Sequence, residues 1–395
     1  MNLALSDEQV FLREAARGAL SRLPTVEAAR EALDGNPDAL PDLWPTAREA
    51  GWPGLLIDEA HGGAGLDAFD AMLVLGECGR VLAGVALLGH LPATAILSAS
   101  SPEGDAPGAE QYLADLASGE RRAAYLPAQP PDDVHEHWST DPASGFQRGS
   151  LPTVGVGGRD LDQNGRVPVS GSFAFVPDAP GADVLIGVAE QGGKPVGVAI
   201  LAASSPEGDA PGVTIEPVTR YDATRSLGHV TLEDAPAVVL DCPEESLAGA
   251  WHLAQSLIAA ESLGSVETAL DVTVAYAKER HTFGRAIGSY QAVKHALTEV
   301  LRQLENGRSL LYYAGWARTG APGEFPLAAS AARSVAGRAL DDAARTMISV
   351  HGGIGATWEH DAPLYFRRAQ LSRRLLGGTA GATDRVAGEL LRQAA

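Results

Sequence analysis

The sequence predicts a mainly helical α+β protein with an N-terminal helical domain, a middle antiparallel β domain and a C-terminal four-helix bundle. Helical patterns fill the first part of the chain, and short β-prone runs between prolines and glycines fill the middle. After Cys242 the pattern is helical again, in long segments joined by short loops. We place the three domains at residues 1–118, 119–241 and 242–395.

The composition limits the kinds of partner. The 395 residues include 30 Lys and Arg against 50 Asp and Glu, a net charge of −20, and so acidic a chain repels nucleic acid and anionic membranes. Hydrophobic residues make up 45%, which is enough for a sizeable core. Two cysteines, Cys78 and Cys242, build no disulfide framework, and no signal peptide or long apolar run is visible. We expect a cytoplasmic protein that binds neither nucleic acid nor a membrane.

The first two domains follow from local patterns. Ser6 is expected to cap the first helix, with Gln9 completing a capping box. The mostly apolar segment 69–88 predicts a pair of buried helices, and 129–160 predicts a long loop. Between residues 121 and 240, turn residues separate short β-prone runs, which predicts a small antiparallel sandwich or barrel. These runs are 184–186, 196–201, 213–215, 230–232 and 238–240.

Four long helices are expected after Cys242. Pro243 suits a first helical position, and no proline follows before Gly284, so about 40 residues can form one helix of about 60 Å. Ser289 is expected to cap a second helix that runs to about residue 318. A third helix at 327–350 and a fourth at 362–376, each followed by two glycines, complete the predicted antiparallel bundle.

Common catalytic motifs are missing from the sequence. It has no P-loop, no G-x-G-x-x-G that opens a helix after a strand, no G-x-S-x-G and no H-E-x-x-H. The short clusters His135–His137 and Glu359–Asp361 have no spaced partner pair, so we expect no metal site.

Two other segments carry a functional signal. In residues 276–295 a long helix ends near Arg280, followed by an aromatic residue, a glycine turn and a second helix. An arginine beside free helix-terminal amides suits a pyrophosphate. In residues 351–361, His-Gly-Gly-Ile-Gly-Ala-Thr-Trp-Glu-His-Asp, three glycines in four positions let another chain or a cofactor approach the backbone. Each segment alone also fits an ordinary turn between helices.

Together, and in this order of helices, strands and helices, the two segments resemble the acyl-CoA dehydrogenase family over nearly the whole chain. The Thr-Trp-Glu-His-Asp sequence is similar to that of actinobacterial members acting on bulky acyl-CoA thioesters. The resemblance implies FAD between the β domain and the bundle, with its diphosphate–adenosine end reaching a neighbouring subunit. It also implies that a glutamate removes a proton from Cα while Cβ gives hydride to the flavin. The implied cofactor-binding residues are Arg280, Thr282, Phe283, Gln291, Ser349, Gly352 and Gly353, with Ser349 in place of the family's usual glutamine.

The catalytic base departs from the family's pattern. Its commonest position, just before a Gly-Thr pair in the last loop, is Gly377 here, and a second position on the long helix is Ala254. Neither residue can take a proton. Glu261 shares a helix face with Ala254, about 10 Å along the axis, and a desolvated carboxylate in an apolar stripe suits a general base. Glu261 is therefore the candidate base, and a structural ion pair with an arginine of a neighbouring helix is the alternative.

Three functions fit these residues. The first is an FAD-dependent acyl-CoA dehydrogenase with a displaced base. The second is a catalytically silent subunit that completes a partner's flavin site. The third is a flavin-free acyl-thioester binding or scaffold protein. The second resembles the paired-subunit acyl-CoA dehydrogenases of sterol side-chain degradation. Retention of Arg280, Phe283 and Gln291 favours the first two. We expect FAD as cofactor, an acyl-CoA substrate, an electron-transfer flavoprotein or similar acceptor, and a homo- or heterotetramer or dimer.

Overall fold

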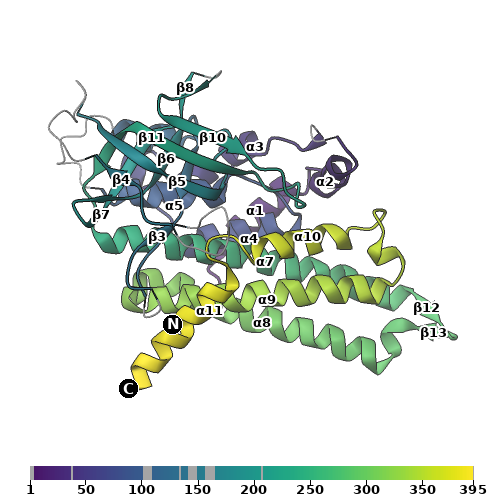
Figure 1. Cartoon of the computed structure of the whole chain (residues 1–395). Helices are drawn as coiled ribbons and strands as arrows, with labels where there is room; N and C mark the ends of the chain where they lie inside the picture. Colours follow the sequence, from purple (N-terminus) through teal and green to yellow (C-terminus); the bar gives the residue numbers. More distant parts are fainter. Residues whose placement is uncertain are drawn as a thin grey trace.

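The computed structural model describes residues 4–36, 39–100, 109–132, 135–140, 149–155, 165–205 and 208–394. Figure 1 shows a β-sheet above one end of a bundle of long helices, with further helices beside the sheet. One apolar core joins the N-terminal helices, the bundle and one side of the sheet, and a second core lies within the β domain. This order of helices, sheet and helices confirms the predicted fold class.

The N-terminal part is helical, as predicted. The Ser6 hydroxyl accepts the Gln9 N–H (3.2 Å) and the Gln9 side chain accepts the Ser6 N–H (3.1 Å), which completes the capping box. The buried pair expected at 69–88 begins as α4, but its second helix, α5, continues to Ser98. The helices are α1 (Asp7–Leu20), α2 (Thr25–Leu33), α3 (Trp44–Glu49), α4 (Ala68–Arg80), α5 (Leu87–Ser98) and α6 (Ala109–Ala117).

The middle of the chain forms a seven-stranded sheet in the order β1-β6-β4-β5-β11-β10, with β7 paired to β6 and β11. The two runs expected at 230–232 and 238–240 are one long strand, β11, with an irregularity between Leu232 and Ala235. Most pairs are antiparallel, but β1 and β4 each run parallel to β6. The prediction of an antiparallel domain missed these two pairs, because turn residues indicate hairpins between neighbouring runs and not the pairing of distant segments. The strands are β1 (Ala123–Leu126), β4 (Thr153–Val154), β5 (Val167–Pro177), β6 (Val184–Gln191), β7 (Lys194–Leu201), β10 (Val213–Pro217) and β11 (Leu227–Leu240).

Short ribbons lie outside this sheet. In the predicted loop at 129–160, the described residues form only the brief strands β3 and β4 and the end of β2. The ribbons pair β2 (Ala128–Gln129) with β3 (Ser139–Thr140), and β8 (Ala203–Ser205) with β9 (Gly208–Asp209).

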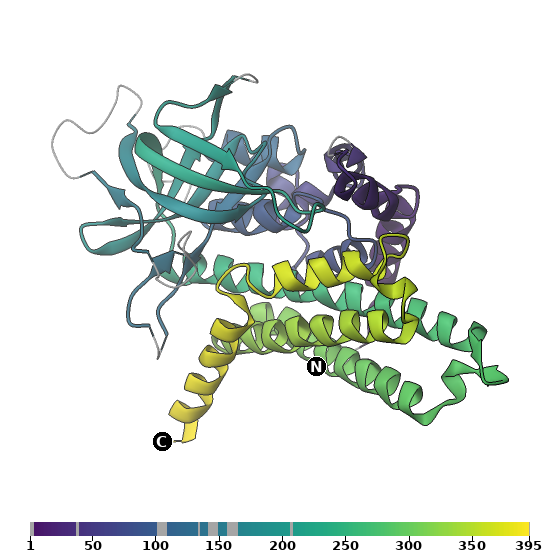
Figure 2. The same ribbon diagram turned by 45° about the vertical axis from the view of Figure 1, so that its right-hand side comes forward.

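The C-terminal part contains the predicted bundle and one further helix. Pro243 is the N-cap of α7 and not its first residue. Ser289 does not cap α8, because its hydroxyl donates to the Ala286 carbonyl (2.7 Å) within a 3-10 turn before the helix. The unexpected α11 projects away from the bundle (Figures 1 and 2). The helices are α7 (Glu244–Glu279), α8 (Gln291–Gly320), α9 (Phe325–His351), α10 (Ala362–Ser372) and α11 (Gly378–Ala394).

Helices α4 and α7 touch through their backbones. A Cβ added at Gly79 would lie 1.9 Å from the Glu261 carbonyl oxygen, so only glycine allows this approach. The Ser265 hydroxyl donates to the Gly79 carbonyl (2.7 Å) at the same crossing. The N-terminal domain is therefore fixed against the part of α7 that carries Glu261. Among the described residues, no helix is both long and apolar enough to cross a bilayer.

Candidate functional site

The end of α7 presents the predicted arginine on a projecting hairpin. Strands β12 (His281–Thr282) and β13 (Arg285–Ala286) form a hairpin whose turn holds Phe283 and Gly284, both with positive φ (51° and 79°). Figures 1 and 2 show this hairpin at the end of the bundle remote from the sheet. Phe283 is 97% exposed, and Arg280 is also exposed. A strained, exposed aromatic residue of this kind is typical of a contact with another molecule.

Two further predicted residues lie on the same hairpin end. The Thr282 carbonyl accepts the hydroxyl of Tyr290 (3.1 Å), which ties the hairpin to the start of α8. Gln291 is exposed on the first turn of that helix. The four predicted residues of this segment, Arg280, Thr282, Phe283 and Gln291, are therefore close along the chain and reach the surface together.

The glycine bend follows α9. Gly352 has φ 65° and ψ −135°, a backbone conformation that residues other than glycine rarely adopt. Gly352 and Gly353 are exposed, and a Cβ added at either would meet nothing within 4 Å. Ser349 is exposed one turn earlier. The bend therefore offers accessible backbone, as a cradle for a diphosphate requires.

The structure brings the arginine hairpin and the glycine bend to one end of the bundle. The Tyr276 ring stacks on the His351 ring with centroids 4.2 Å apart, and the Tyr276 hydroxyl donates to the His351 carbonyl (3.5 Å). The Gly352 N–H is used by the Ile348 carbonyl at the end of α9 (3.1 Å), so the bend offers exposed glycine backbone for close approach. An exposed guanidinium near such backbone is chemically suited to a dinucleotide diphosphate. These residues therefore fit the part of FAD that the family resemblance assigns to them.

The usual position of the base lies in a small space. Gly377 has φ 75°, and a Cβ there would lie 3.2 Å from both the Gln129 side-chain oxygen and the Trp251 ring. Ala254 is completely buried. The adjoining cavity has a volume of about 10 Å³. Its lining residues, none of which carries a carboxylate, are Gln129, Trp251, Gln255, Ser330, Leu376, Gly377, Gly381, Ala382 and Arg385.

One chain does not bring these two half-sites together. Ala254 lies in the first third of α7 and Arg280 directly follows its last residue, 26 residues or about 39 Å apart along the helix axis. The Gly377 cavity contacts β2 through Gln129, whereas the hairpin lies at the remote end of the bundle. A site that uses both therefore requires a second subunit.

Glu261 is held between two buried arginines. Its carboxylate accepts from Arg225, in the loop before β11, and from Arg368 of α10 (Nη1 to Oε1, 2.7 Å), and all three side chains are at most 4% exposed. The Arg368 Nε also donates to Asp222 (2.8 Å). Burial alone would raise the pKa of Asp222, but Arg368 and Arg225 outweigh burial and lower it. Both Glu261 oxygens are thus occupied, in the arrangement that the sequence left as the alternative to a base.

Sequence reasoning missed the other members of this cluster. Arg367 and Arg368 were visible as a pair on the fourth helix, and a charge on the apolar face of that helix was the available signal. Asp222 and Arg225 lie in an irregular loop, where no periodicity distinguishes a buried charge from an exposed one.

Asp178 is a further buried carboxylate near the cluster. It is 6% exposed and accepts the Gly89 N–H (2.8 Å). Burial raises its pKa from the ordinary 3.8 to about 6, against the hydrogen bond from Gly89 and the charge of Arg225, which lower it. Folded chains therefore bind more protons at this residue than unfolded chains between about pH 4 and pH 6. Its contribution to stability is complete below about pH 4 and is lost as the pH rises through 6.

Replacing Asp178 with asparagine is expected to stabilise the protein at pH 7 and to leave it little changed below about pH 4. Asparagine can still accept the Gly89 N–H, and it tolerates the positive φ of 62° at this residue. The shift corresponds to on the order of 3 kcal/mol at neutral pH. Urea unfolding of both proteins at the two pH values measures it. A difference between the two proteins that is the same at both pH values would contradict the assignment.

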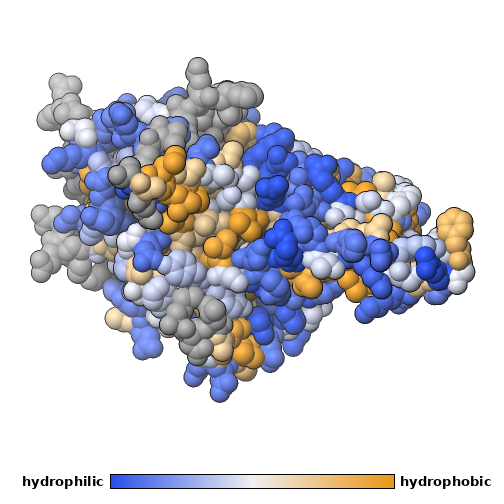
Figure 3. All heavy atoms as spheres, turned by 90° about the horizontal axis from the view of Figure 1, so that it is seen from below, coloured by the Kyte–Doolittle hydropathy of each residue, from blue (hydrophilic) through white to orange (hydrophobic). Residues whose placement is uncertain are grey.

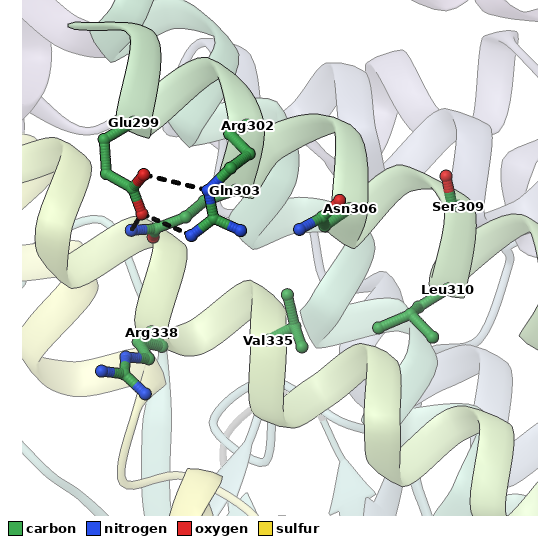
Figure 4. Close-up of a pocket in the computed structure, with 8 residues that line it drawn as sticks. All are labelled: Glu299, Arg302, Gln303, Asn306, Ser309, Leu310, Val335 and Arg338. Carbon is green, nitrogen blue, oxygen red and sulfur yellow. Dashed lines mark hydrogen bonds and ion pairs between the residues drawn. The ribbon is translucent and has the colours of Figure 1, made fainter. Parts of the chain in front are cut away.

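A groove on the bundle is remote from these residues. It measures about 600 Å³ and lies on the outer face of α8 and α9 (Figure 4), where Glu299 pairs with Arg302 of its own helix. None of the predicted cofactor residues lines it. The underside of the molecule has separate apolar areas among hydrophilic ones, and its far end, where the hairpin lies, is apolar at the tip (Figure 3). In the described part of the chain, no group of three or more metal-binding side chains comes together.

Comparison with known proteins agrees with this architecture. Residues 6–120 match the family model for the acyl-CoA dehydrogenase N-terminal domain, and residues 251–391 match that for the C-terminal domain. Acyl-CoA dehydrogenase IpdE2 of Mycobacterium tuberculosis is 31% identical over 372 residues, which cover 94% of this chain and 93% of that protein. The solved Tcur3481-Tcur3483 steroid ACAD has a TM-score of 0.82 and 26% identity, with 98% of this chain and 99% of that chain covered.

A helical domain, a β domain and a bundle that carries an arginine hairpin beside a glycine bend define a flavoprotein oxidoreductase fold. The chain belongs to the acyl-CoA dehydrogenase family, as its sequence motifs predicted. Acyl-CoA dehydrogenase FadE34 of Mycobacterium tuberculosis is 30% identical over 98% of this chain, yet the match spans only 48% of that longer protein.

Proposed function

We propose that this chain is one subunit of an FAD-dependent acyl-CoA dehydrogenase in which a different subunit supplies the catalytic base. The observation that carries the proposal is the cavity beside Gly377, which measures about 10 Å³ and has no carboxylate in its lining. Such a volume holds about one water molecule and no acyl thioester. The exposed arginine hairpin and glycine bend remain available to a second subunit.

The residues at the end of the bundle would complete the partner's flavin site. When bound, FAD takes up the hydride that leaves Cβ of the acyl thioester. Arg280 would hold the diphosphate by charge-assisted hydrogen bonds, and the exposed Gly352–Gly353 backbone, which has no side chains, would let it approach closely. Phe283 would cover an apolar part of the cofactor, with Thr282, Gln291 and Ser349 as polar contacts at its edge.

We infer that Glu261 has a structural role. A base needs a carboxylate that can leave its hydrogen bonds and take a proton from the substrate. Both Glu261 oxygens accept from arginine, and the side chain is 4% exposed. The two arginines occupy the carboxylate, and its burial separates it from any thioester. We propose no other described residue of this chain as the catalytic base.

The named relatives support a hetero-oligomer. FadE34 is about twice as long as this chain, and the chain matches about half of FadE34. This is expected if two units of this size act together. The Tcur3481-Tcur3483 steroid ACAD is named for two components, and the ChsE4-ChsE5 complex from Mycobacterium tuberculosis has the same fold. By analogy with the steroid enzyme, we propose a bulky acyl-CoA substrate. From the family resemblance, we propose an electron-transfer flavoprotein or similar acceptor.

The flavin spectrum of the chain, purified alone and with a candidate partner subunit, tests this proposal. We expect that the chain alone reduces no flavin when a bulky acyl-CoA is added, and that the assembly contains FAD and bleaches. Bleaching by the chain alone would instead identify an autonomous dehydrogenase. An assembly that stays colourless would favour the flavin-free scaffold.

A further inference from the structure

Three stacked rings connect the arginine hairpin to the glycine bend. The rings of Tyr276 and His351 have centroids 4.2 Å apart with planes inclined by 27°, and the His351 and His360 rings are also 4.2 Å apart, inclined by 48°. They come from the last turn of α7, the end of α9 and the segment before α10. Each ring therefore belongs to a different element at this end of the bundle.

The backbone fixes how the two imidazoles are turned. The His351 Nδ1 lies 2.7 Å from the Met347 carbonyl, which can only accept, so this nitrogen carries the proton. The His360 Nδ1 accepts the Ala362 N–H (3.0 Å) at the start of α10. His351 is 4% exposed. The middle ring is thus held by two neighbouring rings and by its own helix.

The stack stands directly beside the two groups that the proposed cofactor site needs. His351 immediately precedes Gly352, whose backbone conformation only glycine adopts readily. Tyr276 precedes Arg280 by four residues, about one helical turn or 6 Å. A shift of the middle ring would therefore move the glycine bend relative to the arginine hairpin.

We propose that the Tyr276–His351–His360 stack is a positioning element that sets the spacing between Arg280 and the glycine bend for one dinucleotide diphosphate. This inference rests on the proposed function, because it assumes that both segments touch the same FAD. The groups around the stack also affect the charge of His360. Burial lowers the pKa of His360, and His351 and Arg30 lower it further, while Asp361 acts in the opposite sense.

The test measures FAD affinity of the assembly with its partner subunit by flavin fluorescence. His351→Ala removes both ring contacts and is expected to weaken FAD binding about tenfold. His351→Phe keeps a ring in the stack and is expected to bind within about twofold of the wild type. At Tyr276, the Tyr276→Leu variant is likewise expected to bind FAD more weakly, and Tyr276→Phe is expected to bind it about as tightly as the wild type.

A double-mutant cycle distinguishes positioning from general damage. In an Arg280→Gln background, His351→Ala should cost less than about threefold, because the contact that the stack positions is already lost. Equal costs in both backgrounds, or unchanged affinity in His351→Ala, would overturn the inference. If Arg280→Gln weakens binding and His351→Ala does not, the proposed function stands without the stack. If the wild-type assembly takes up no FAD, both proposals fall.

Hydrogen exchange of the chain without FAD provides a second readout that needs no bound cofactor. In His351→Ala, amides of residues 281–286 should exchange several-fold faster than in the wild type, although the substitution lies on another helix. In His351→Phe their exchange should be unchanged. Unchanged exchange in both variants would show that the stack does not hold the hairpin and would overturn the inference.

Discussion

Replacing Glu261 with glutamine is expected to destabilise the folded chain by about 3–5 kcal/mol. The substitution leaves Arg225 and Arg368 buried, each 3% exposed or less, without the carboxylate that both contact. Removing one partner of a buried ion pair is costly because the remaining charges cannot regain their water. Urea unfolding of the full chain, followed by circular dichroism, measures the loss.

Asp271→Asn is the matched control for this substitution. Asp271 lies on the same helix, is 62% exposed and is 3.5 Å from Arg80. Exposed pairs contribute less than about 1 kcal/mol, so the control should unfold close to the wild type. In the assembly, below its unfolding transition, Glu261→Gln should still allow flavin reduction by acyl-CoA. A stable Glu261→Gln variant that binds flavin but is not reduced would restore Glu261 as the base.

The sequence predicted what depends on local patterns. Capping at Ser6, long helices after Pro243 and the glycine-rich bend at 352–355 are each encoded by neighbouring residues. The pairing of β1 with β6 is not, because it joins segments about 60 residues apart whose order in the sheet depends on the whole domain. α11 was missed since the Gly377–Gly378 pair reads as a helix end, and here it also precedes a new helix.

The candidate site was predictable only in part. Its motif residues were identified from the resemblance, and the structure adds that Tyr276 and His351 bring the two motifs together. The surroundings of Gly377 could not be foreseen, because Gln129 comes from the β domain and Trp251 from α7. Likewise, Arg333 donates to the Leu375 carbonyl (3.3 Å) from a fully buried position, where burial lowers its pKa to about 9. Such long-range contacts leave no periodic trace in the sequence.

Replacing Arg280 with glutamine is expected to weaken FAD binding by the assembly roughly 10- to 100-fold. The proposed site uses this guanidinium for charge-assisted hydrogen bonds to the diphosphate, and one such contact contributes about 1.5–3 kcal/mol. Because Arg280 is exposed at the end of α7, its loss should not unfold the chain. Fluorescence titration of FAD into the cofactor-depleted assembly measures the affinity, with the melting temperature recorded alongside.

Arg285→Gln separates a specific contact from a general effect of charge. Arg285 lies in the same hairpin, is exposed, and has its guanidinium 4.0 Å from the centre of the Tyr290 ring. Both substitutions remove one positive charge from the same surface, so long-range attraction of the anionic cofactor falls equally in both. Only Arg280→Gln should cost tenfold or more. Equal losses in the two variants would mean that the hairpin attracts FAD by charge alone, and unchanged affinity in Arg280→Gln would remove this end of the bundle from the cofactor site.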